Sequence, residues 1–441
     1  MQRIAIVSEH ASPLAPVGGV DSGGQNIYVA NVARQLAARG YRVDVFTRLD
    51  NPSQPPVIDW DENVRIIHVP AGPARVLPKE DLIPLMGGFS RYLRDCFEVA
   101  EEPYDLIHAN FFMSAMAALP VARRFGIPLA VTFHALGRVR RRHQAQADRF
   151  PDSRFGIEDE IVRQADCIIA ECPQDRQDLI ELYGADPGRI SMVPCGFDRD
   201  EMAPMDRAQA RSLVRWEPDA FYLLQLGRMV PRKGIDNVIR ALARLRFQYR
   251  VDARLCVVGG NIAMPTDQDV PEWRRLRDVA REEGVLDFVE FTGRRGRSQL
   301  RRYYCAADAF VSTPWYEPFG MTPVEAMACA TPVVGADTGG IRYSVVDAVT
   351  GFLVPPRDPD RLAGKLAVLA RDPDLARRMG RAGMHRANRM FTWQRVGDEL
   401  AGIFEVLARQ RPRPSGSRVP LFRGVPAAPA LQQAGDPGGK D

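Results

Sequence analysis

The chain has 441 residues, of which 45% are hydrophobic and 26% are charged. This composition is typical of a soluble globular protein, and the length predicts about two domains. The formal net charge of +4 is too small to predict nucleic-acid binding, but it suits a protein that handles anionic nucleotides or touches an acidic membrane surface.

Cysteine usage and the N-terminus exclude further classes. The seven Cys residues are odd in number and form no CxxC pair, so neither a disulfide framework nor a zinc cluster is expected. The opening stretch, MQRIAIVSEH, has no long apolar core or cleavage signal, and no apolar run reaches the length of a membrane span. We therefore expect a cytoplasmic protein, at most in weak peripheral contact with the inner face of the membrane.

Short apolar runs alternate with amphipathic helical patterns along the first half of the chain. The pattern at 25–40 ends at Gly40, as a helix followed by a left-handed glycine does. Strands are predicted at 3–8, 42–47, 64–69, 105–110, 129–134, 166–171 and 190–194. They are mostly short and rich in Val and Ile, as buried parallel strands are, so the alternation predicts an α/β fold with a doubly wound parallel sheet.

The same alternation repeats after 193–206, where Pro, Gly and Asp replace the periodic pattern. Helical patterns cover 234–246 and 323–330. Strands are predicted at 221–227, 254–260, 288–293, 309–313, 331–336 and 351–355. The second half is therefore expected to form a second sheet of the same kind.

These patterns predict two Rossmann-like domains, 1–197 and 198–391. The helical pattern at 392–409 has no strand after it, and we expect it to join the first domain. Residues 411–441 are rich in Pro and Gly without a period, which predicts disorder. Since doubly wound sheets bind ligands at their carboxyl ends, the site is expected in a cleft between the two domains.

Two basic residues follow the first strand of the second half. The segment QLGRMVPRKG at 225–234 places Arg228 and Lys233 before a predicted helix. Two cations beside a helix N-terminus suit a diphosphate, whose charge must be neutralised as it leaves. A solvated basic turn is the competing interpretation of this short motif.

The segment PWYEPFGMTPVEAMACATPVV at 314–334 contains two glutamates. Thr322 and Glu325 fit a capping box, with Thr322 as N-cap and Glu325 at the third helical position. Glu317, between Tyr and Pro in a loop, has no comparable structural task. The FGMT stretch would place backbone N–H groups at a helix N-terminus, where they suit sugar hydroxyls or phosphate.

Together, Glu317-x7-Glu325 and the upstream GRMVPRKG resemble the family-4 group of retaining glycosyltransferases with the GT-B fold. The resemblance covers nearly the whole chain to about residue 409. It implies that Glu317 holds the donor hexose, Glu325 the ribose, and Arg228 with Lys233 the diphosphate. It further implies donor contacts from the backbone of Phe319, Gly320 and Met321, and from Arg294 near the base.

Ala330 departs from the family pattern, which usually has Gly before TPVV. A left-handed turn at Ala330 would be strained by about 1 kcal/mol.

The first half narrows the resemblance. Residues 18–48 are similar to the subgroup that includes sucrose-phosphate synthases and inositol-phosphate glycosyltransferases. This implies that the first domain binds the acceptor and the second the donor. Gly23 and Gly24 would form an acceptor loop that lets the backbone approach a ligand. His134 aligns with the family's active-site histidine, and His108 is a further candidate for acceptor binding, although a lone His at a strand end is more often structural.

Four positions bear on whether the acceptor carries a phosphate. By the resemblance, Lys79 and Arg154 would bind the phosphate of the acceptor. Phe111 and Ala135 stand where members with phosphorylated acceptors tend to have Tyr and a hydroxyl residue, which weighs against a phosphorylated acceptor. The run GRVRRRH at 137–143 could bind an anionic acceptor or lipid headgroups, or form a solvated helix face.

No metal or other cofactor is expected to be required. Asp59-Trp60-Asp61 has the DxD form used for metals in another glycosyltransferase fold, but it lies in a Pro-rich segment and is expected to cap a turn. In the GT-B fold, basic residues and helix dipoles generally replace the metal.

The predicted reaction is retaining transfer of a hexose, glucose by preference, from a nucleoside-diphosphate sugar to a sugar or sugar-phosphate hydroxyl. UDP-glucose is the favoured donor and GDP-mannose the next. Alternatives are mannosyl or N-acetylglucosaminyl transfer to an inositol phosphate, lipid or polysaccharide, a nucleotide-sugar epimerase, a phosphorylase, or a regulatory sugar-nucleotide binding module. An NAD dehydrogenase is disfavoured, because no GxGxxG follows a strand.

Overall fold

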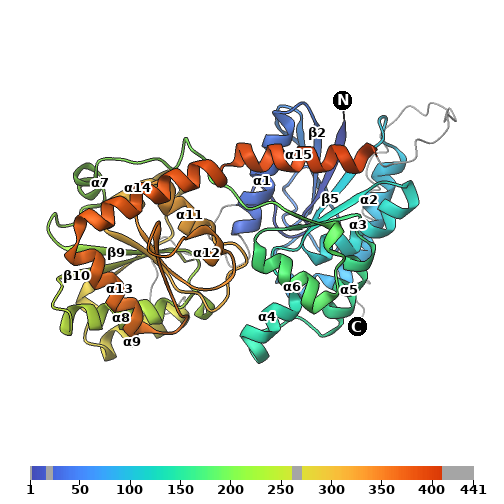
Figure 1. The fold of residues 1–441 in the computed structure, drawn as a ribbon. Helices are drawn as coiled ribbons and strands as arrows, with labels where there is room; N and C mark the ends of the chain where they lie inside the picture. The colour runs from blue at the N-terminus through green and yellow to red at the C-terminus, as the bar shows by residue number, and fades with distance from the viewer. Residues whose placement is uncertain (1, 16–22, 261–270, 410–441) are drawn as a thin grey trace, which may run out of the picture.

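The computed structural model describes residues 2–15, 23–260 and 271–409. Figure 1 shows two α/β units side by side, each a sheet with helices packed around it. This confirms the predicted fold class. The disorder predicted for 411–441 concerns residues outside the described ranges, as does the glycine-rich segment before Gly23.

The first unit is built on an eight-stranded sheet in the order β3-β4-β2-β1-β5-β6-β7-β8. The strands are β1 (Arg3–Val7), β2 (Arg42–Arg48), β3 (Val57–Asp61), β4 (Val64–Val69), β5 (Leu106–Asn110), β6 (Leu129–Thr132), β7 (Cys167–Ala170) and β8 (Ile190–Met192). All its pairings are parallel except that of β3 with β4. Ile4 and Ile6 enter one hydrophobic cluster and Ala5 and Val7 the other, so β1 is buried on both faces, as its apolar run predicts.

The helices of this unit lie between its strands along the chain. They are α1 (Gly24–Ala37), α2 (Met86–Glu98), α3 (Phe112–Phe125), α4 (Gly137–Gln144), α5 (Ser153–Gln164) and α6 (Pro173–Tyr183). In α2, the buried Met86, Phe89, Leu93 and Phe97 recur every three or four residues, the spacing of one helical face. The α1 helix ends at Ala37, earlier than predicted, and Gly40 takes its positive φ of 86° just beyond the end.

Strand β3 corrects the prediction for the Asp59-Trp60-Asp61 segment. These residues form an antiparallel edge strand rather than a turn. The carboxylate of Asp61 pairs with Arg34 at 3.1 Å, and the Arg34 guanidinium lies 4.3 Å from the centre of the Trp60 ring. The segment therefore serves the edge of the sheet, where Arg34 covers it.

The second unit contains a six-stranded, fully parallel sheet in the order β11-β10-β9-β12-β13-β14. Its strands are β9 (Phe221–Leu226), β10 (Ala253–Val258), β11 (Val289–Gly293), β12 (Ala309–Ser312), β13 (Val333–Ala336) and β14 (Gly351–Val354). Its helices are α7 (Arg207–Val214), α8 (Ile235–Phe247), α9 (Pro271–Glu282), α10 (Arg297–Ala306), α11 (Met321–Ala328), α12 (Gly339–Ser344), α13 (Pro359–Arg371) and α14 (Pro373–Met390). Leu223 and Leu224 pack into different clusters, so this sheet is also covered on both faces.

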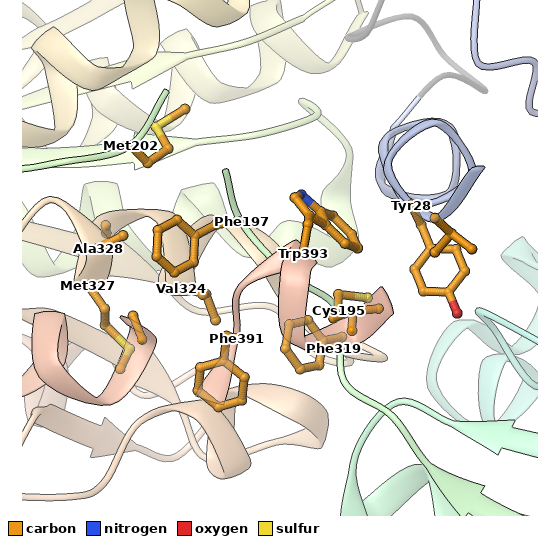
Figure 2. Packing of buried hydrophobic residues seen from close by; sticks show 14 of the residues in the cluster. Tyr28, Cys195, Phe197, Met202, Phe319, Val324, Met327, Ala328, Phe391 and Trp393 are labelled. Atoms are coloured by element: carbon orange, nitrogen blue, oxygen red, sulfur yellow. The ribbon is translucent and has the colours of Figure 1, made fainter. Parts of the chain in front are cut away.

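The last helix, α15 (Trp393–Arg409), leaves the second unit and runs over the first (Figure 1). It packs on α1, and Arg39 of the loop after α1 bonds Asp398 at 2.6 Å. The chain passes between the two units twice, near Phe197 and between Phe391 and Trp393, and these two segments are hydrogen-bonded to each other. Phe197 N donates to Phe391 O, and Trp393 N donates to Phe197 O. Figure 2 shows Phe197, Phe391 and Trp393 in one hydrophobic cluster that extends from Tyr28 of α1 to Val324 of α11.

Candidate active site

The glycine loop of the first unit meets the basic segment of the second. A Cβ atom added to Gly23 would lie 3.7 Å from Nε of Arg228, and one added to Gly24 would lie 3.2 Å from Cε of Met321. The loop therefore runs directly against the segments after β9 and before α11. Since β9 and the first strands end here, the candidate site lies where the sequence predicted it, between the two sheets.

Glu317 lies in the loop after β12 and is held by two cations from the segment after β9. Its carboxylate forms an ion pair with Nζ of Lys233, and Nη1 of Arg232 lies 3.7 Å away. Strands β9 and β12 are neighbours in the sheet, which brings the two motifs together. Arg232, which also donates to the Tyr316 carbonyl at 3.1 Å, was not singled out from the sequence, where it reads as another basic residue of a turn.

Burial and charge act in opposite directions on this pair. Burial raises the pKa of Glu317, but Lys233 and then Arg232 outweigh it and leave that pKa below its ordinary value. Burial lowers the pKa of Lys233 to about 8, although Glu317 opposes the change. Glu317, only 9% exposed, therefore stays an anion able to accept hydrogen bonds from hydroxyl groups.

Two glycines fix the backbone around Glu317. The N–H of Gly340 donates to the Glu317 carbonyl at 3.1 Å. A Cβ atom on Gly339 would lie 1.9 Å from the same carbonyl oxygen, and one on Gly340 would lie 2.2 Å from the Phe319 carbonyl oxygen. The start of α12 can therefore pack against the loop only with glycine at both positions. Neither glycine was identified from the sequence, where the DTGG stretch at 337–340 before a helix is the pattern that could have indicated them.

His134 follows β6 and has both ring nitrogens hydrogen-bonded. Its Nδ1 lies 2.8 Å from Oε1 of Glu171, and its Nε2 lies 3.0 Å from Oδ1 of Asn110. The residue has a positive φ of 56°, and its side chain is 9% exposed. Neither Glu171 nor Asn110 was identified from the sequence, because each follows or ends a strand far from His134 along the chain.

Comparisons with known proteins place this geometry in a family. Residues 22–201 match the model described as Glycosyltransferase Family 4, and residues 206–386 match the model described as Glycosyl transferases group 1. The chain belongs to the group 1 glycosyltransferases. This confirms the family resemblance, the GT-B fold and the expectation of a hexosyltransferase.

Individual relatives of this glycosyltransferase cover almost its whole length. It is 37% identical to D-inositol 3-phosphate glycosyltransferase 2 of Catenulispora acidiphila, over 91% of this chain and 94% of the relative. Among solved structures, sucrose-phosphate synthase from Thermosynechococcus elongatus is 32% identical, with a TM-score of 0.85 over 92% of this chain and 99% of that one. HepE of Anabaena in complex with UDP and glucose is 19% identical, with a TM-score of 0.70 over 92% of this chain and 100% of that one, a likeness in fold.

The second glutamate of this glycosyltransferase does not form the predicted capping box. Helix α11 begins at Met321 after Gly320, which has a positive φ of 89°. Glu325 instead accepts hydrogen bonds from Nη1 of Arg297 at 2.9 Å and from the Tyr304 hydroxyl at 2.8 Å. The prediction failed because the helix starts one residue before Thr322, which moves Glu325 off the capping position. Its ribose-binding role stays a prediction.

Of the other donor-site candidates, Phe319, Gly320 and Met321 lie at the start of α11, and Arg294 lies directly after β11. The side chain of Phe319 packs in the core 5.8 Å from the Phe391 ring (Figure 2), so its backbone is the part available to a donor. Met321 is half-buried opposite Gly24, and Arg294 is exposed directly after β11. Ala330 has the left-handed φ of 59° expected from the family's glycine.

His108 is enclosed rather than open to the cleft. It is fully buried, and its Nε2 lies 2.9 Å from the Thr132 hydroxyl. Its ring meets Phe404 of α15 edge to face at 5.3 Å. Burial, and then His134, lower its pKa to about 3, so it is neutral. The structure thus gives His108 a packing position, not one that contacts an acceptor.

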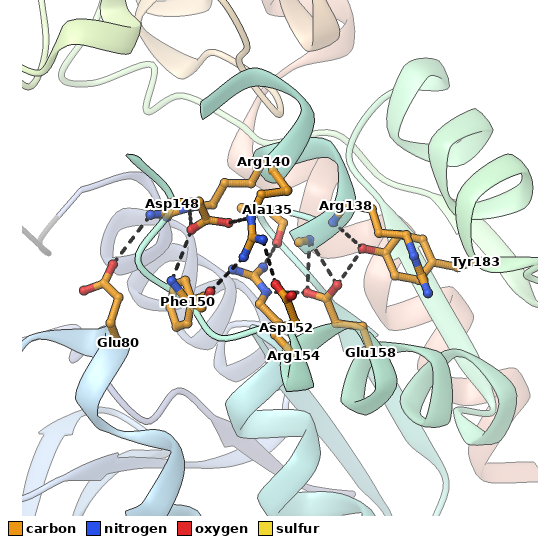
Figure 3. Close-up of polar contacts among 12 residues, drawn as sticks. Glu80, Ala135, Arg138, Arg140, Asp148, Phe150, Asp152, Arg154, Glu158 and Tyr183 are labelled. Atoms are coloured by element: carbon orange, nitrogen blue, oxygen red, sulfur yellow. Dashed lines mark hydrogen bonds and ion pairs between the residues drawn. The ribbon is translucent and has the colours of Figure 1, made fainter. Parts of the chain in front are cut away.

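Arg154, expected to bind an acceptor phosphate, is enclosed as well. Its Nε bonds Glu158 at 2.7 Å, Nη2 donates to the Ala135 carbonyl, and its side chain has no exposed surface (Figure 3). Its guanidinium lies 5.1 Å from the Phe111 ring centre and faces Phe112 and Phe150. Contact with an acceptor would require this arrangement to open.

Lys79, the remaining acceptor candidate, and the basic run at 137–143 lie beside acidic residues. Lys79 lies 4.0 Å from Glu80, which is 3.6 Å from Arg140. Arg140 also bonds Asp148 at 2.7 Å (Figure 3). Arg138 bonds Asp159, and Arg141 bonds Asp152. The run therefore carries less unpaired positive charge than its sequence indicates. Peripheral membrane contact stays a prediction.

A cavity of about 250 Å³ opens beside Glu317 between the two units. Its first wall comes from α4 and α6, and its second from the Glu317 loop and the start of α12. His143 of α4 stacks on Tyr316 of the loop at 5.4 Å, and the Cys172 thiol donates to the Pro318 carbonyl at 3.3 Å. These contacts join the two units at the edge of the site.

Within the described residues, no three His, Cys, Asp or Glu side chains gather in a way that could hold a metal ion. No helix of the described segments combines the length and apolar character needed to cross a membrane. The expectation that catalysis needs no metal stays a prediction.

Proposed function

We propose that this glycosyltransferase moves a hexose, with retention of configuration, from a nucleoside-diphosphate sugar to a hydroxyl of a sugar-type acceptor. The observation that carries the proposal is the Glu317–Lys233 pair, whose two segments also supply Arg228 and Met321, the side chains against the Gly23–Gly24 loop. An ionised carboxylate suits the hydroxyls of a hexose, and the cations beside it suit a diphosphate.

Charge develops on the diphosphate as its bond to the anomeric carbon breaks. Arg228 and Lys233 stabilise that charge electrostatically, which is how oxyanion leaving groups are commonly assisted. The acceptor oxygen then bonds to the anomeric carbon on the same face of the sugar, and its proton passes to an oxygen of the departing phosphate. Atoms and charge balance in this step without a metal ion or a protein nucleophile.

UDP-glucose is the donor we propose, and GDP-mannose is the next candidate. The 32% identity to a sucrose-phosphate synthase supports a sugar or sugar phosphate as acceptor. The 37% identity to D-inositol 3-phosphate glycosyltransferases supports a second candidate, transfer to an inositol phosphate. The enclosure of Arg154 weighs against both phosphorylated acceptors, since its side chain has no exposed surface and its Nε and Nη2 are already bonded.

A donor screen followed by product analysis tests the proposal. A sugar nucleotide present at 100 times its dissociation constant adds about 2.7 kcal/mol to the free energy of unfolding. UDP-, GDP- and ADP-sugars would be compared by thermal unfolding. The best donor is then incubated with sugars, sugar phosphates and inositol phosphates, and NMR reports the anomeric configuration of the product.

Three outcomes would contradict the proposal. They are no stabilisation by any sugar nucleotide, an inverted product, and wild-type turnover in both Arg228→Ala and Lys233→Ala. Consumption of donor without acceptor would favour the epimerase, and dependence on inorganic phosphate the phosphorylase.

A further inference from the structure

The hydrogen bonds around His134 determine which protons its ring carries. On one side, Oε1 of Glu171 lies 2.8 Å from Nδ1. An ionised carboxylate only accepts hydrogen bonds, so Nδ1 donates to it. Glu171 is 3% exposed, which leaves its carboxylate little access to water.

On the other side, Asn110 presents its oxygen to the ring. Its Nδ2 donates to the His108 carbonyl at 3.3 Å, which turns Oδ1 toward Nε2 of His134 at 3.0 Å. The reverse orientation of the amide would bring two oxygens together at the His108 carbonyl. The backbone carbonyl of Asn110 is held by Nε2 of Gln25 at 3.1 Å, which fixes the residue further. Nε2 of His134 must therefore donate as well.

The other groups that face the ring are neutral. Tyr28 of α1 meets it edge to face at 4.8 Å, and burial raises the pKa of the Tyr28 hydroxyl. The Cys195 thiol donates to the same Oε1 of Glu171 at 3.1 Å, and burial raises its pKa too. His108 is neutral because burial, and then His134, lower its pKa to about 3. Glu171 thus supplies the negative charge next to the ring.

We propose that Glu171 is a positioning residue that, with Asn110, holds His134 as an imidazolium donating from both nitrogens. The proposal deepens the proposed function, on which its catalytic consequence rests. An imidazolium has no lone pair to accept a proton. His134 therefore cannot be the base that deprotonates the acceptor, and that proton passes to the departing phosphate. His134 contributes instead a positive charge just after β6, since both of its N–H groups are already donated to Glu171 and Asn110.

The state of the ring can be measured without any substrate. The chain has 6 His residues, and ¹⁵N-histidine NMR distinguishes protonated from unprotonated ring nitrogens. His134→Gln assigns the His134 signals. In the wild type at pH 7.5, both nitrogens of His134 should be protonated. In Glu171→Gln one of them should lose its proton at this pH, whereas Glu171→Asp should restore it.

Cys195→Ala is the matched control, because it removes the other hydrogen bond to Oε1 of Glu171 without touching the ring. It should leave the His134 signals and the transferase activity unchanged. A neutral His134 in the wild type would overturn the proposal. Unchanged His134 signals in a folded Glu171→Gln variant would overturn it as well.

Activity gives a second readout that a merely structural role would not move. Without a carboxylate partner, an imidazole commonly loses its charge between about pH 5 and 8. The kcat/KM of Glu171→Gln should therefore be more than tenfold below wild type at pH 8, and it should recover toward pH 5.5. A loss equal at all pH values would contradict the proposal. If the wild type transfers no sugar while the NMR result holds, the proposed function fails and the assignment of the His134 protons stands.

Discussion

Glu317 and Lys233 come from separate segments, and in each residue the effect of burial on the pKa is opposed by the charge of the other. Either group alone would be costly at this depth, since a buried charge without a partner loses its hydration. The pair keeps Glu317 ionised and leaves Lys233 with a pKa of about 8, below that of an ordinary lysine. This lysine therefore changes its charge at mildly alkaline pH, as does Asp175 of the neighbouring cavity, because burial raises the pKa of that carboxyl to about 8.

The pH dependence of donor capture should follow Lys233. The ammonium is charged below its pKa and neutral above it, so kcat/KM should fall as pH rises through about 8. In Lys233→Arg the guanidinium stays charged, and whatever activity remains should show no such fall. Rate profiles of kcat/KM between pH 6 and 10, which report the free enzyme, test this. Identical alkaline limbs in both proteins would exclude Lys233 as the titrating group.

The two glutamates should separate in function. Glu317→Gln removes the charged acceptor for the hexose, worth about 2 kcal/mol, so kcat/KM should fall roughly thirtyfold while affinity for the free nucleoside diphosphate is kept. Glu325→Gln should instead weaken binding of the free nucleoside diphosphate, the expected result for a ribose contact. Calorimetry with the nucleotide and with the sugar nucleotide distinguishes them. Equal losses for both ligands in both variants would contradict the assigned roles.

At the scale of elements, the loop after β12 is shaped by the helix that follows β13. The start of α12 approaches the Glu317 and Phe319 carbonyls so closely that Gly339 and Gly340 have no room for a side chain. The acidic residue of the motif is thus placed by glycines more than 20 positions away in the sequence. The loop after β12 and α12 form one structural unit.

Gly340→Ala should therefore damage both stability and activity. Its Cβ would lie 2.2 Å from the Phe319 carbonyl oxygen, so the loop must shift. Gly402→Ala is the control, because a Cβ there meets nothing within 4 Å. Alanine in place of glycine in a helix interior should raise the free energy of unfolding by about 0.5–1 kcal/mol. Urea unfolding and kcat/KM measure the two effects. Wild-type kcat/KM in a folded Gly340→Ala variant would show that the loop does not depend on α12.

At the scale of the whole molecule, the two units are joined by paired crossings of the chain. Phe197 bonds to Phe391 and Trp393 through backbone groups, and Gly196 has its α-carbon against Trp393 with no space for a Cβ. Trp393 is 2% exposed and meets Tyr28 edge to face at 6.0 Å. Helix α15 therefore ties the position of the second unit to α1 and its glycine loop.

Trp393→Ala should uncouple the units. Loss of a buried tryptophan costs about 3–5 kcal/mol, and because Trp393 links both units, urea unfolding should change from one transition to two. The control is Val406→Ala on the same helix, where Val406 is 54% exposed and the change should stay within about 0.5 kcal/mol. A single transition with wild-type stability in Trp393→Ala would contradict this account of the join.

Several features followed from sequence patterns alone. The apolar runs predicted all but one of the strands in the described part of the chain, because buried parallel strands are continuous and apolar. The helix at 392–409 was predicted from its helical pattern. Strand β3 was not predicted because it is short and exposed at the edge of the sheet, follows Pro residues, and alternates charged with apolar residues. Arg228, Lys233 and Glu317 were identified because their motifs are local.

The tertiary structure decided which groups each of those residues meets. Arg232 at Glu317, Arg297 at Glu325 and Glu171 at His134 are pairings between residues far apart in sequence, and no local pattern encodes them. Burial also changed the role available to Arg154 and His108, since enclosure depends on neighbours from other elements. The sequence by itself determined the fold class and the chemistry of the motifs. Their charge states and partners depend on desolvation and packing, which exist only once the chain is folded.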